Sequence, residues 1–256
     1  MRLLSVAGGL FISHDKILNR VVENRVTRRS LLKFGIAAGI SLAGISAAGC
    51  ASQATPTATP PGNSSASPVP GAELTEYGGQ KLDSIKSFRE NSIHGTQHIS
   101  ADSYTVSISG LVDNARTYSY QDLTALASYQ KVVTLHCVEG WDATALWEGV
   151  SVKDMLDQAG IKPGAKTAIF YAQDGDSTSF GIDDIKSQDF MLAYKVNNIL
   201  LTEQHGYPSR LVAAEKWGYK WIKWVTKIEL SDQDYKGYWE RNGYSNNGDL
   251  SQSFFS

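Results

Sequence analysis

The sequence predicts an α+β domain in which a few short helices accompany mixed β-sheets. Short segments with alternating polarity or many β-branched residues occur along the chain and end at turn residues, as strands do, whereas capped helical patterns are rare. The 256 residues include about 180 beyond an N-terminal leader, a length that can build one well-filled core. We therefore expect a single folded domain.

The predicted elements follow one another from residue 104 onward. Residues 104–110 alternate in polarity and stop at a glycine, and residues 131–136 are rich in β-branched residues. Ser151 is a favourable N-cap for a short helix over residues 151–159, because the apolar side chains that follow lie on one face before Gly160. Further strands are expected at 166–172, 209–214 and 222–230.

The charge of the chain argues against nucleic-acid binding. Residues 1–50 hold seven of the 24 Lys and Arg and two of the 26 Asp and Glu, which leaves 17 basic and 24 acidic residues in 51–256, a formal charge of −7. Nucleic-acid phosphates are bound by clustered Lys and Arg, which so acidic a domain does not favour. We expect no nucleic acid among its partners.

Residues 1–50 are predicted to be an export signal. Arg28 and Arg29 stand before an apolar run over residues 34–48, which is short for a membrane span and suits the core of a signal peptide. The paired arginines and the Leu-Leu-Lys that follows resemble the twin-arginine export signal, which carries folded proteins. The alternative is an ordinary secretory leader that contains Arg-Arg. Either signal places the domain in the periplasm or at the cell surface.

Cys50 follows Ala-Ala-Gly at the end of the apolar run, as in a lipoprotein cleavage site. A lipid-modified Cys50 would become the mature N-terminus and attach the protein to a membrane surface, whereas the alternative is a free cysteine at a cleavage boundary. Residues 51–81 are predicted to be a flexible tether, because residues 51–72 are mainly Thr, Pro, Ser, Ala and Gly. The folded domain is expected to cover residues 82–256.

Cys137 is the main candidate for chemistry, because it follows the predicted strand at 131–136 and opens a loop. Three interpretations fit the residues alone. Cys137 could be a small buried apolar residue, a nucleophile with His136 or His205 as its base, or a thiolate ligand of a metal. One cysteine without a partner cysteine or clustered histidines cannot build a closed zinc site, so a metal here would need further ligands from a cofactor such as a dithiolene.

Three blocks of sequence stand in a fixed order around and after Cys137. They are residues 137–141 with 147–150 and the helix at 151–159; residues 192–197 with 205–212; and residues 216–225 with 228–230. In order and spacing, these blocks resemble the sulfite-oxidase superfamily of molybdenum enzymes. The resemblance is greatest to its bacterial periplasmic branch, which includes the catalytic subunit of the methionine-sulfoxide reductase system. It covers nearly all of residues 82–240 and implies a sulfite-oxidase-type molybdopterin-binding fold.

The resemblance implies a molybdenum atom bound to molybdopterin, with Cys137 as the single protein ligand of the metal. Arginine can donate two hydrogen bonds to a phosphate, lysine adds a point charge, and glycine lets backbone amides approach an anion. Without the resemblance, the basic residues could be ordinary surface charges and His205 a structural turn residue. The implied cofactor contacts are His205, Arg210, Gly218, Lys220, Trp221, Ile222 and Lys223 and, by a looser match over residues 87–92, Arg89, Glu90 and Asn91.

The resemblance also implies two-electron oxygen-atom transfer as the reaction. Glu139 and Trp141 are expected beside the metal ligand on the substrate side, although Glu139 could instead accept a hydrogen bond that supports a ligand. Sulfite-oxidising relatives carry an Arg-rich stretch after the ligand cysteine, whereas Glu139 would repel sulfite. We therefore expect reduction of an S-oxide or N-oxide, with sulfite oxidation as the alternative on the same fold. Asp174 and Asp176 form either a further loop of the site or a solvated turn.

Electrons are expected to come from or go to a separate partner, a quinone-linked membrane subunit or a cytochrome, because the sequence contains no Cys-x-x-Cys-His motif for haem. The longer sulfite oxidases carry an immunoglobulin-like dimerisation domain, whereas about 25 residues follow Leu230 here, so we expect a monomer. Two other classes remain open. One is an anchored hydrolase that uses Cys137 and a histidine, and the other is a non-catalytic lipoprotein binding module with this fold.

Overall fold

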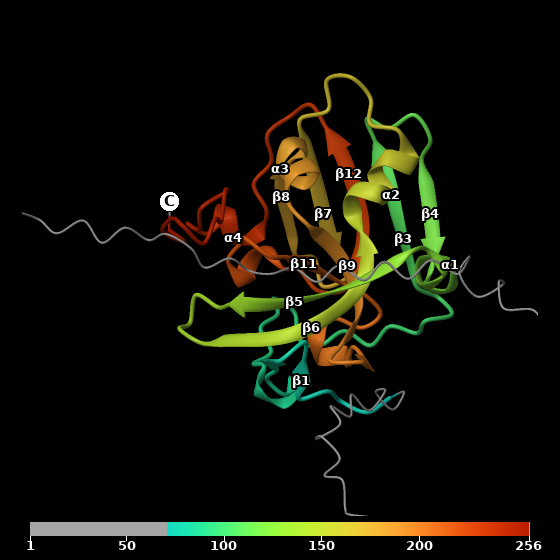
Figure 1. Cartoon of the computed structure of the whole chain (residues 1–256). Coiled ribbons are helices and arrows are strands. Elements are labelled where there is room, and N and C mark those ends of the chain that lie inside the picture. The colour runs from blue at the N-terminus through green and yellow to red at the C-terminus, as the bar shows by residue number, and fades with distance from the viewer. Residues whose placement is uncertain (1–70, 256) are drawn as a thin grey trace, which may run out of the picture.

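The computed structural model describes residues 71–255, in which two five-stranded β-sheets are joined by loops and short helices (Figure 1). The predicted α+β class with mixed sheet is confirmed. The predicted signal peptide, with its twin arginines and Cys50, and the tether up to residue 70 lie outside the described residues. Among residues 71–255, no helix has the length and apolar character needed to cross a bilayer.

The first sheet is antiparallel and contains a hairpin whose two strands lie before and after Cys137 in the chain. It consists of β5 (Ser128–His136), β6 (Asp142–Ser151), β9 (Phe190–Val196), β10 (Ile199–Leu200) and β11 (Arg210–Ala213). The strand order is β10-β9-β6-β5, and β11 also pairs with β9. Pairing within the β5–β6 hairpin runs from Ser128 opposite Val150 to His136 opposite Asp142, so Cys137 begins the connecting loop.

The second sheet is mixed and confirms three of the predicted strands. It consists of β3 (Thr105–Gly110), β4 (Arg116–Ser119), β7 (Thr167–Ala172), β8 (Ser177–Gly181) and β12 (Val225–Ser231). Its order is β4-β3-β12-β7-β8, in which β12 runs parallel to β3 and antiparallel to β7. The parallel pair joins strands that lie far apart in the sequence, which no local pattern could predict.

The helices are short and begin at capping residues in two cases. They are α1 (Tyr120–Ala125), α2 (Val152–Ala159), α3 (Ile182–Ser187) and α4 (Tyr238–Arg241), with 3-10 turns at Ile85–Ser87, Glu203–His205 and Gly218–Lys220. The predicted helix is α2: the Ser151 hydroxyl accepts a hydrogen bond from the backbone N–H of Asp154, and Gly160 follows its last residue with φ +74°. Ser119 and Asp122 form a capping box at α1.

Residues 71–81, which the sequence places in the tether, belong to the folded part of the chain. They include β1 (Glu76–Tyr77) and β2 (Gln80–Lys81), an antiparallel pair. The Glu73 carboxylate accepts hydrogen bonds from the backbone N–H of Ile85 (2.6 Å) and from the Ser84 hydroxyl (3.1 Å), and so holds the start of a 3-10 turn. The domain therefore begins before residue 82.

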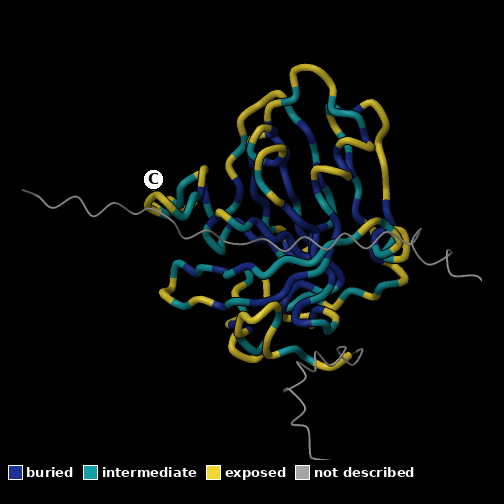
Figure 2. The backbone as a smooth tube through the Cα atoms, viewed as in Figure 1, coloured by how far each residue is buried: buried dark blue, intermediate teal, exposed yellow. Residues whose placement is uncertain are grey.

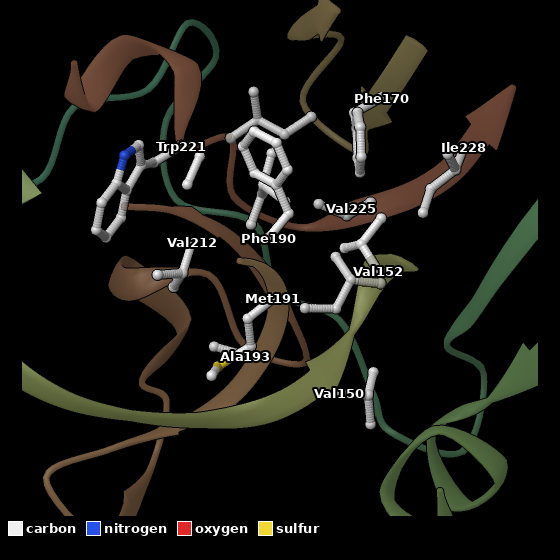
Figure 3. Close-up of a cluster of buried hydrophobic side chains, with 14 of the residues drawn as sticks. Val150, Val152, Phe170, Phe190, Met191, Ala193, Val212, Trp221, Val225 and Ile228 are labelled. Carbon is white, nitrogen blue, oxygen red and sulfur yellow. The ribbon is translucent and has the colours of Figure 1, made fainter. Parts of the chain in front are cut away.

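The core fills the space between the two sheets. Figure 3 shows part of the buried cluster, with Phe190 and Met191 of β9, Phe170 of β7, and Val225 and Ile228 of β12, and all five side chains are almost fully buried. The strands that carry them are the dark blue segments at the centre of Figure 2, whereas the loops at the ends of the sheets are exposed. A rigid core directly behind the loops can hold loop side chains in a fixed arrangement.

The strand predicted at 222–230 begins only at Val225. Trp224 adopts φ +54°, a left-handed conformation that a regular strand does not contain. The pairing register also shifts between Val225 and Lys227, so that Val225 is buried and Thr226 is half-buried, opposite to the simple alternation. The consequence is that the residues before Val225 form a loop whose side chains are available to line a cavity.

Candidate active site

A cavity of about 1060 Å³, a volume that includes its open mouth, lies at the end of the β5–β6 hairpin. In Figure 1 the end of β5 lies near α4, and residues of both segments line the cavity. Most of the site residues predicted from the sequence meet here, whereas Glu90 and Lys220 do not line it. The predicted residues that do line it are Arg89, Asn91, Cys137, Glu139, Trp141, His205, Arg210, Gly218, Trp221, Ile222 and Lys223.

A tight turn holds Cys137 at the cavity. The backbone N–H of Cys137 donates to the carbonyl of Trp141 (2.9 Å), and the carbonyl of Cys137 accepts from the backbone N–H of Gly140 (3.0 Å). Gly140 has φ +82°, a conformation that glycine adopts without a steric penalty. These bonds fix the backbone on both sides of the thiol, so the Cys137 side chain is placed by the hairpin and not by a flexible loop.

The Cys137 side chain is buried and its thiol contacts polar groups at the cavity wall. Asn91 Nδ2 lies 3.9 Å from Cys137 Sγ and donates a hydrogen bond to it. Burial raises the pKa of the thiol, and this effect outweighs the backbone N–H of Glu139 and the positive charge of Arg89, which both lower it. The free thiol therefore holds its proton at neutral pH, whereas binding a metal cation would displace that proton.

Gly218 is needed because its backbone lies against the start of the Cys137 turn. A Cβ atom at this position would lie 3.0 Å from the carbonyl oxygen of His136 and 3.2 Å from Leu135 Cδ2. The same atom would lie 3.7 Å from the Cα of Cys137. The third sequence block is thereby packed directly on the first, as the shared cofactor site requires.

Arg210 brings a buried positive charge to the cavity. Its guanidinium donates to the carbonyls of His205 (3.3 Å) and Trp221 (3.1 Å) and lies 5.2 Å from the ring of Trp147. Nε has no hydrogen-bond partner, and none of the ion pairs within residues 71–255 includes Arg210. Burial lowers the pKa of Arg210 to about 10. A buried cation without an acid requires an anion from elsewhere.

His205 lies beside Arg210 and is held in its neutral form. Its Nδ1 is 2.6 Å from the hydroxyl of Thr202, and its ring packs edge-on against Phe88. Nε2 is buried without a partner at hydrogen-bonding distance among the described residues. Burial and the positive charge of Arg210 lower the pKa of His205 to about 4. The unused ring nitrogen is available to a ligand in the cavity.

Lys223 adds a second cation at the same end of the cavity. Its ammonium group donates to the carbonyl of Gln204 (2.9 Å) and lies 4.1 Å from the ring of Trp224. Burial and the charge of Arg210 lower the pKa of Lys223 to about 8. Glu90, predicted as a cofactor contact, instead lies 3.6 Å from the Lys223 ammonium group and accepts from Thr96. Glu90 thus does not line the cavity itself but pairs with Lys223, which does.

Lys220 does not reach the cavity, contrary to its predicted role as a cofactor contact. Its side chain is fully buried, and its ammonium group binds Glu240 (2.7 Å) and the carbonyls of Ser179 (2.8 Å) and Asn246 (2.9 Å). A buried carboxylate partner satisfies the charge of Lys220, so it offers nothing to a phosphate.

The remaining wall of the cavity is acidic and aromatic. Asp174 and Asp176 lie on the turn between β7 and β8, so this turn forms part of the cavity wall. Tyr219, Trp239 and Tyr244 also line the cavity, and sequence reasoning missed all three. Trp239 and Tyr244 belong to the segment after Leu230, where their aromatic character was the only available signal. This wall carries no predicted cofactor contact.

The arrangement fits an anionic cofactor that brings a metal to Cys137. The cavity contains a buried thiol and, as far as residues 71–255 are concerned, a buried guanidinium without an acidic partner and a histidine nitrogen without a hydrogen bond. Within residues 71–255, no group of three or more His, Cys, Asp and Glu side chains could hold a metal by itself. The donor set therefore matches a metal that receives one ligand from Cys137 and the others from a bound anion.

Comparison with known proteins places this cavity in a described family. Residues 94–239 match the oxidoreductase molybdopterin binding domain. The chain belongs to this family. The predicted resemblance, the sulfite-oxidase-type fold and the assignment to an enzyme class are thereby confirmed. Molybdopterin is the cofactor of this family, and Cys137, Arg210, His205 and Lys223 are the residues here that fit it.

The similar proteins include enzymes with different reactions. The uncharacterized oxidoreductase YuiH of Bacillus subtilis is 35% identical over 147 residues, which cover 57% of this chain and 74% of that protein. The putative protein-methionine-sulfoxide reductase subunit YedZ1 of Azospira oryzae is 29% identical over 149 residues, 58% of this chain and 57% of that protein. The crystal structure of the sulfane dehydrogenase SoxCD from Paracoccus pantotrophus matches with a TM-score of 0.56 and 25% identity, over 60% of this chain and 44% of that one. This chain thus spans about half the length of the last two proteins.

The family block at residues 147–150 supports the site from behind. Trp147 is fully buried and packs edge-on against Trp221, with ring centroids 5.8 Å apart, and the Arg210 guanidinium lies 5.2 Å from its ring. Gly149 of β6 pairs with Ala193 of β9, and a Cβ atom at Gly149 would lie 2.1 Å from the carbonyl oxygen of Leu192. The block therefore positions Arg210 by packing and contributes no residue that lines the cavity.

Proposed function

We propose that this protein is a molybdenum-dependent oxidoreductase that reduces an S-oxide or N-oxide outside the cytoplasm. The observation that carries the proposal is that the Cys137 thiol and the unpaired, buried guanidinium of Arg210 line one cavity. A molybdopterin dithiolene and phosphate would satisfy both groups. Bound there, the cofactor would supply two-electron redox chemistry and exchange of one oxygen atom with the substrate.

The residues that line the cavity would have different roles in holding the cofactor. Cys137, once its proton is lost, would hold the metal at a fixed point, because the β5–β6 turn leaves its backbone no freedom. Arg210 and Lys223 would bind the anionic end of the cofactor, and the neutral His205 would hydrogen-bond to it through Nε2. Trp221 and Ile222 would exclude water from that end, since both are almost fully buried.

The charges near Cys137 support a neutral substrate. Glu139 is exposed at the cavity wall, where its carboxylate accepts a hydrogen bond from the Trp141 indole (3.3 Å), and Asp174 and Asp176 add two more carboxyl groups. The carboxylates of Glu139 and Asp174 repel a sulfite dianion. Sulfite oxidation is a second candidate, because Arg89 also lines the cavity and its positive charge acts on Cys137.

The proposal includes an electron-transfer partner and a place in the cell. Similarity to a putative methionine-sulfoxide reductase subunit supports a separate redox partner, either a quinone-linked membrane subunit or a cytochrome. The twin-arginine signal and Cys50, both outside the described residues, remain predictions, and they would place a lipid-anchored domain at the outer face of a membrane. The domain would act as a monomer.

Metal analysis of the protein tests this proposal. The full chain, Cys137→Ala and the matched control Cys50→Ala are produced in a host that makes molybdopterin. We expect about one molybdenum per chain, with oxidised pterin fluorescence, in the wild type and the control. Cys137→Ala should lose the metal or the absorption that arises from thiolate-to-molybdenum charge transfer. Correctly folded wild type without molybdenum, or an unchanged spectrum in Cys137→Ala, would contradict the proposal.

Activity assays then separate the reaction directions and the other classes. The proposal predicts oxidation of reduced viologen by sulfoxides or amine N-oxides, and sulfite-dependent reduction of ferricyanide would instead support the second candidate. A cysteine hydrolase would lose a hydrolytic activity on thiol alkylation whether or not molybdenum is present. A binding module would show neither metal nor turnover.

A further inference from the structure

The turn between β7 and β8 holds two carboxyl groups rigidly at the wall of the cavity. The backbone N–H of Ala172 donates to the carbonyl of Asp176 (2.9 Å), and Asp174 Oδ1 accepts from the backbone N–H of Asp176 (3.1 Å). Asp174 Oδ2 accepts from the backbone N–H of Ile93 (3.4 Å), which ties the turn to the loop that follows Arg89 and Asn91. The turn is therefore built into the wall of the site.

Asp176 has only one of its two carboxyl oxygens engaged by the turn. Oδ1 accepts from the backbone N–H of Ser177 (2.7 Å), and Asp176 is half-buried at the cavity wall. None of the ion pairs within residues 71–255 includes Asp174 or Asp176. Trp239 also forms a hydrogen-bond interaction with the Asp176 carboxyl group, and this group lines the cavity.

The surroundings of Asp176 favour its protonated form. The burial of the carboxyl and the negative charge of Asp174 raise the pKa of Asp176 to about 7, and Glu240 of α4 acts in the same direction. The other charged or titratable groups beside this turn are engaged elsewhere. Lys220 is bound by Glu240, Lys223 lies near Glu90, and His94 Nδ1 is 2.6 Å from the carbonyl of Asp174.

We propose that Asp176 is a general acid of the reaction, which delivers a proton to the oxygen atom that leaves the substrate. This proposal rests on the proposed function. Reduction of a sulfoxide breaks the sulfur–oxygen bond, transfers two electrons to sulfur and releases the oxygen as water, which requires two protons. The electrons come through the cofactor from an external donor, reduced viologen in the assay. Asp176 supplies one proton, solvent supplies the other, and the resulting carboxylate is reprotonated from solvent through the cavity mouth.

The chemistry explains why an acid stands on this wall and not beside Arg210. At the cationic end a carboxyl group would lose its proton, because Arg210 and Lys223 favour the carboxylate. Beside Asp174 and Glu240, burial raises the pKa of Asp176 to about 7, although hydrogen bonds from Ser177 and Trp239 act to lower it. The charge of Asp174 also acts on Lys223, so the acidic turn borders the cationic part of the same cavity.

The pH profile of kcat/KM tests the role of Asp176. The substrate is an aryl methyl sulfoxide, which does not titrate near neutral pH, and the enzyme is the molybdenum-loaded full chain. The wild type should show constant kcat/KM below pH about 7 and a decline of about tenfold per pH unit above it. Asp176→Asn should lower the plateau by about 100-fold or more and abolish the inflection, with its molybdenum content retained. Asp102→Asn, an exposed aspartate outside the cavity, is the matched control and should leave the profile unchanged.

Two further measurements keep the proposal open to refutation. In Asp176→Glu the acid is retained in a different position, so activity should recover in part and the inflection should move. Infrared difference spectra should show a protonated carboxyl band in the wild type that titrates near pH 7 and is absent from Asp176→Asn. An unchanged profile in Asp176→Asn or Asp176→Glu, in an active molybdenum-loaded enzyme, would refute the role of Asp176 alone. Wild type without molybdenum would refute the proposed function and this role with it.

Discussion

Replacing Arg210 by methionine removes a buried positive charge that has no acidic partner among residues 71–255. Methionine has a similar length and can keep the packing against Trp147. The change therefore tests one property of the site, the need for an anion, with little change of shape. The matched control is Arg116→Met, because Arg116 is exposed outside the cavity and also donates to a carbonyl, that of Gln158 (3.2 Å).

The size of the effect follows from the pKa of Arg210. Burial lowers this pKa to about 10, and each unit of pKa corresponds to about 1.4 kcal/mol, so the charge costs about 3 kcal/mol in the fold without an anion. Because the folded pKa lies below the unfolded one, this cost is present throughout the neutral range. Removing the side chain also leaves the carbonyls of His205 and Trp221 without their donor, at about 1–3 kcal/mol each. The two effects offset each other, so the unfolding free energy of the cofactor-free variant should lie within about 2 kcal/mol of wild type.

The assay is thermal unfolding of cofactor-free protein with and without inorganic phosphate. At about 100 times its Kd, phosphate would stabilise the folded wild type by about 2.7 kcal/mol, which raises Tm by roughly 5–10 °C in a domain of this size. Arg210→Met should lose most of this increase, and Arg116→Met should keep it. Equal increases in the wild type and Arg210→Met would refute the assignment of Arg210 to an anion, as would an absent increase in the wild type.

Two further predictions concern His205 and Lys220. The folded pKa of His205 is about 4, below its unfolded value, so the unfolded state binds more protons as pH falls from about 6.5 to 4, and cofactor-free wild type should lose about 3 kcal/mol of stability over this window. His205→Gln should lose less in urea unfolding at matched pH values, and equal losses would contradict the assignment. Lys220→Met leaves Glu240 buried without its partner and should cost about 3–5 kcal/mol, whereas Lys153→Met in the exposed pair with Asp157 should cost less than about 1 kcal/mol. If the Lys220 variant unfolds like wild type in urea yet binds phosphate poorly, Lys220 is a cofactor contact after all.

Much of the site could be predicted from short segments of sequence. Cys137 ends a β-branched strand and is followed by Gly140, so a strand that ends in a tight turn is determined locally. Gly218 and Gly149 stand in blocks that a family resemblance identifies, and the structure supplies the reason, since a Cβ at Gly149 would clash with the Leu192 carbonyl and one at Gly218 would be crowded by the His136 carbonyl. Such features depend on neighbours in the chain or on backbone contacts that only glycine permits.

The direction of the long charged side chains could not be predicted in the same way. Lys220 and Lys223 lie three residues apart in one block, and the sequence assigns both to the cofactor. Glu240 lies 20 residues further along the chain and binds Lys220, so that of the two lysines only Lys223 lines the cavity. The sequence assigned no site residue to the segment after Leu230, although Trp239 in it lines the cavity. Trp239 belongs to α4, which packs against β8, and this contact between distant segments cannot be predicted from the local sequence.

The sequence by itself determined the fold class and the position of Cys137 at the end of a strand, because alternation and capping are properties of short segments. The family to which the chain belongs was indicated by the resemblance of three ordered sequence blocks. Only the tertiary structure decided which charges are satisfied. It paired Lys220 with Glu240, left Arg210 without an acid and placed Asp176 among like charges. The physical reason is that the energy of a buried charge depends on partners and solvent that arrive from distant parts of the chain.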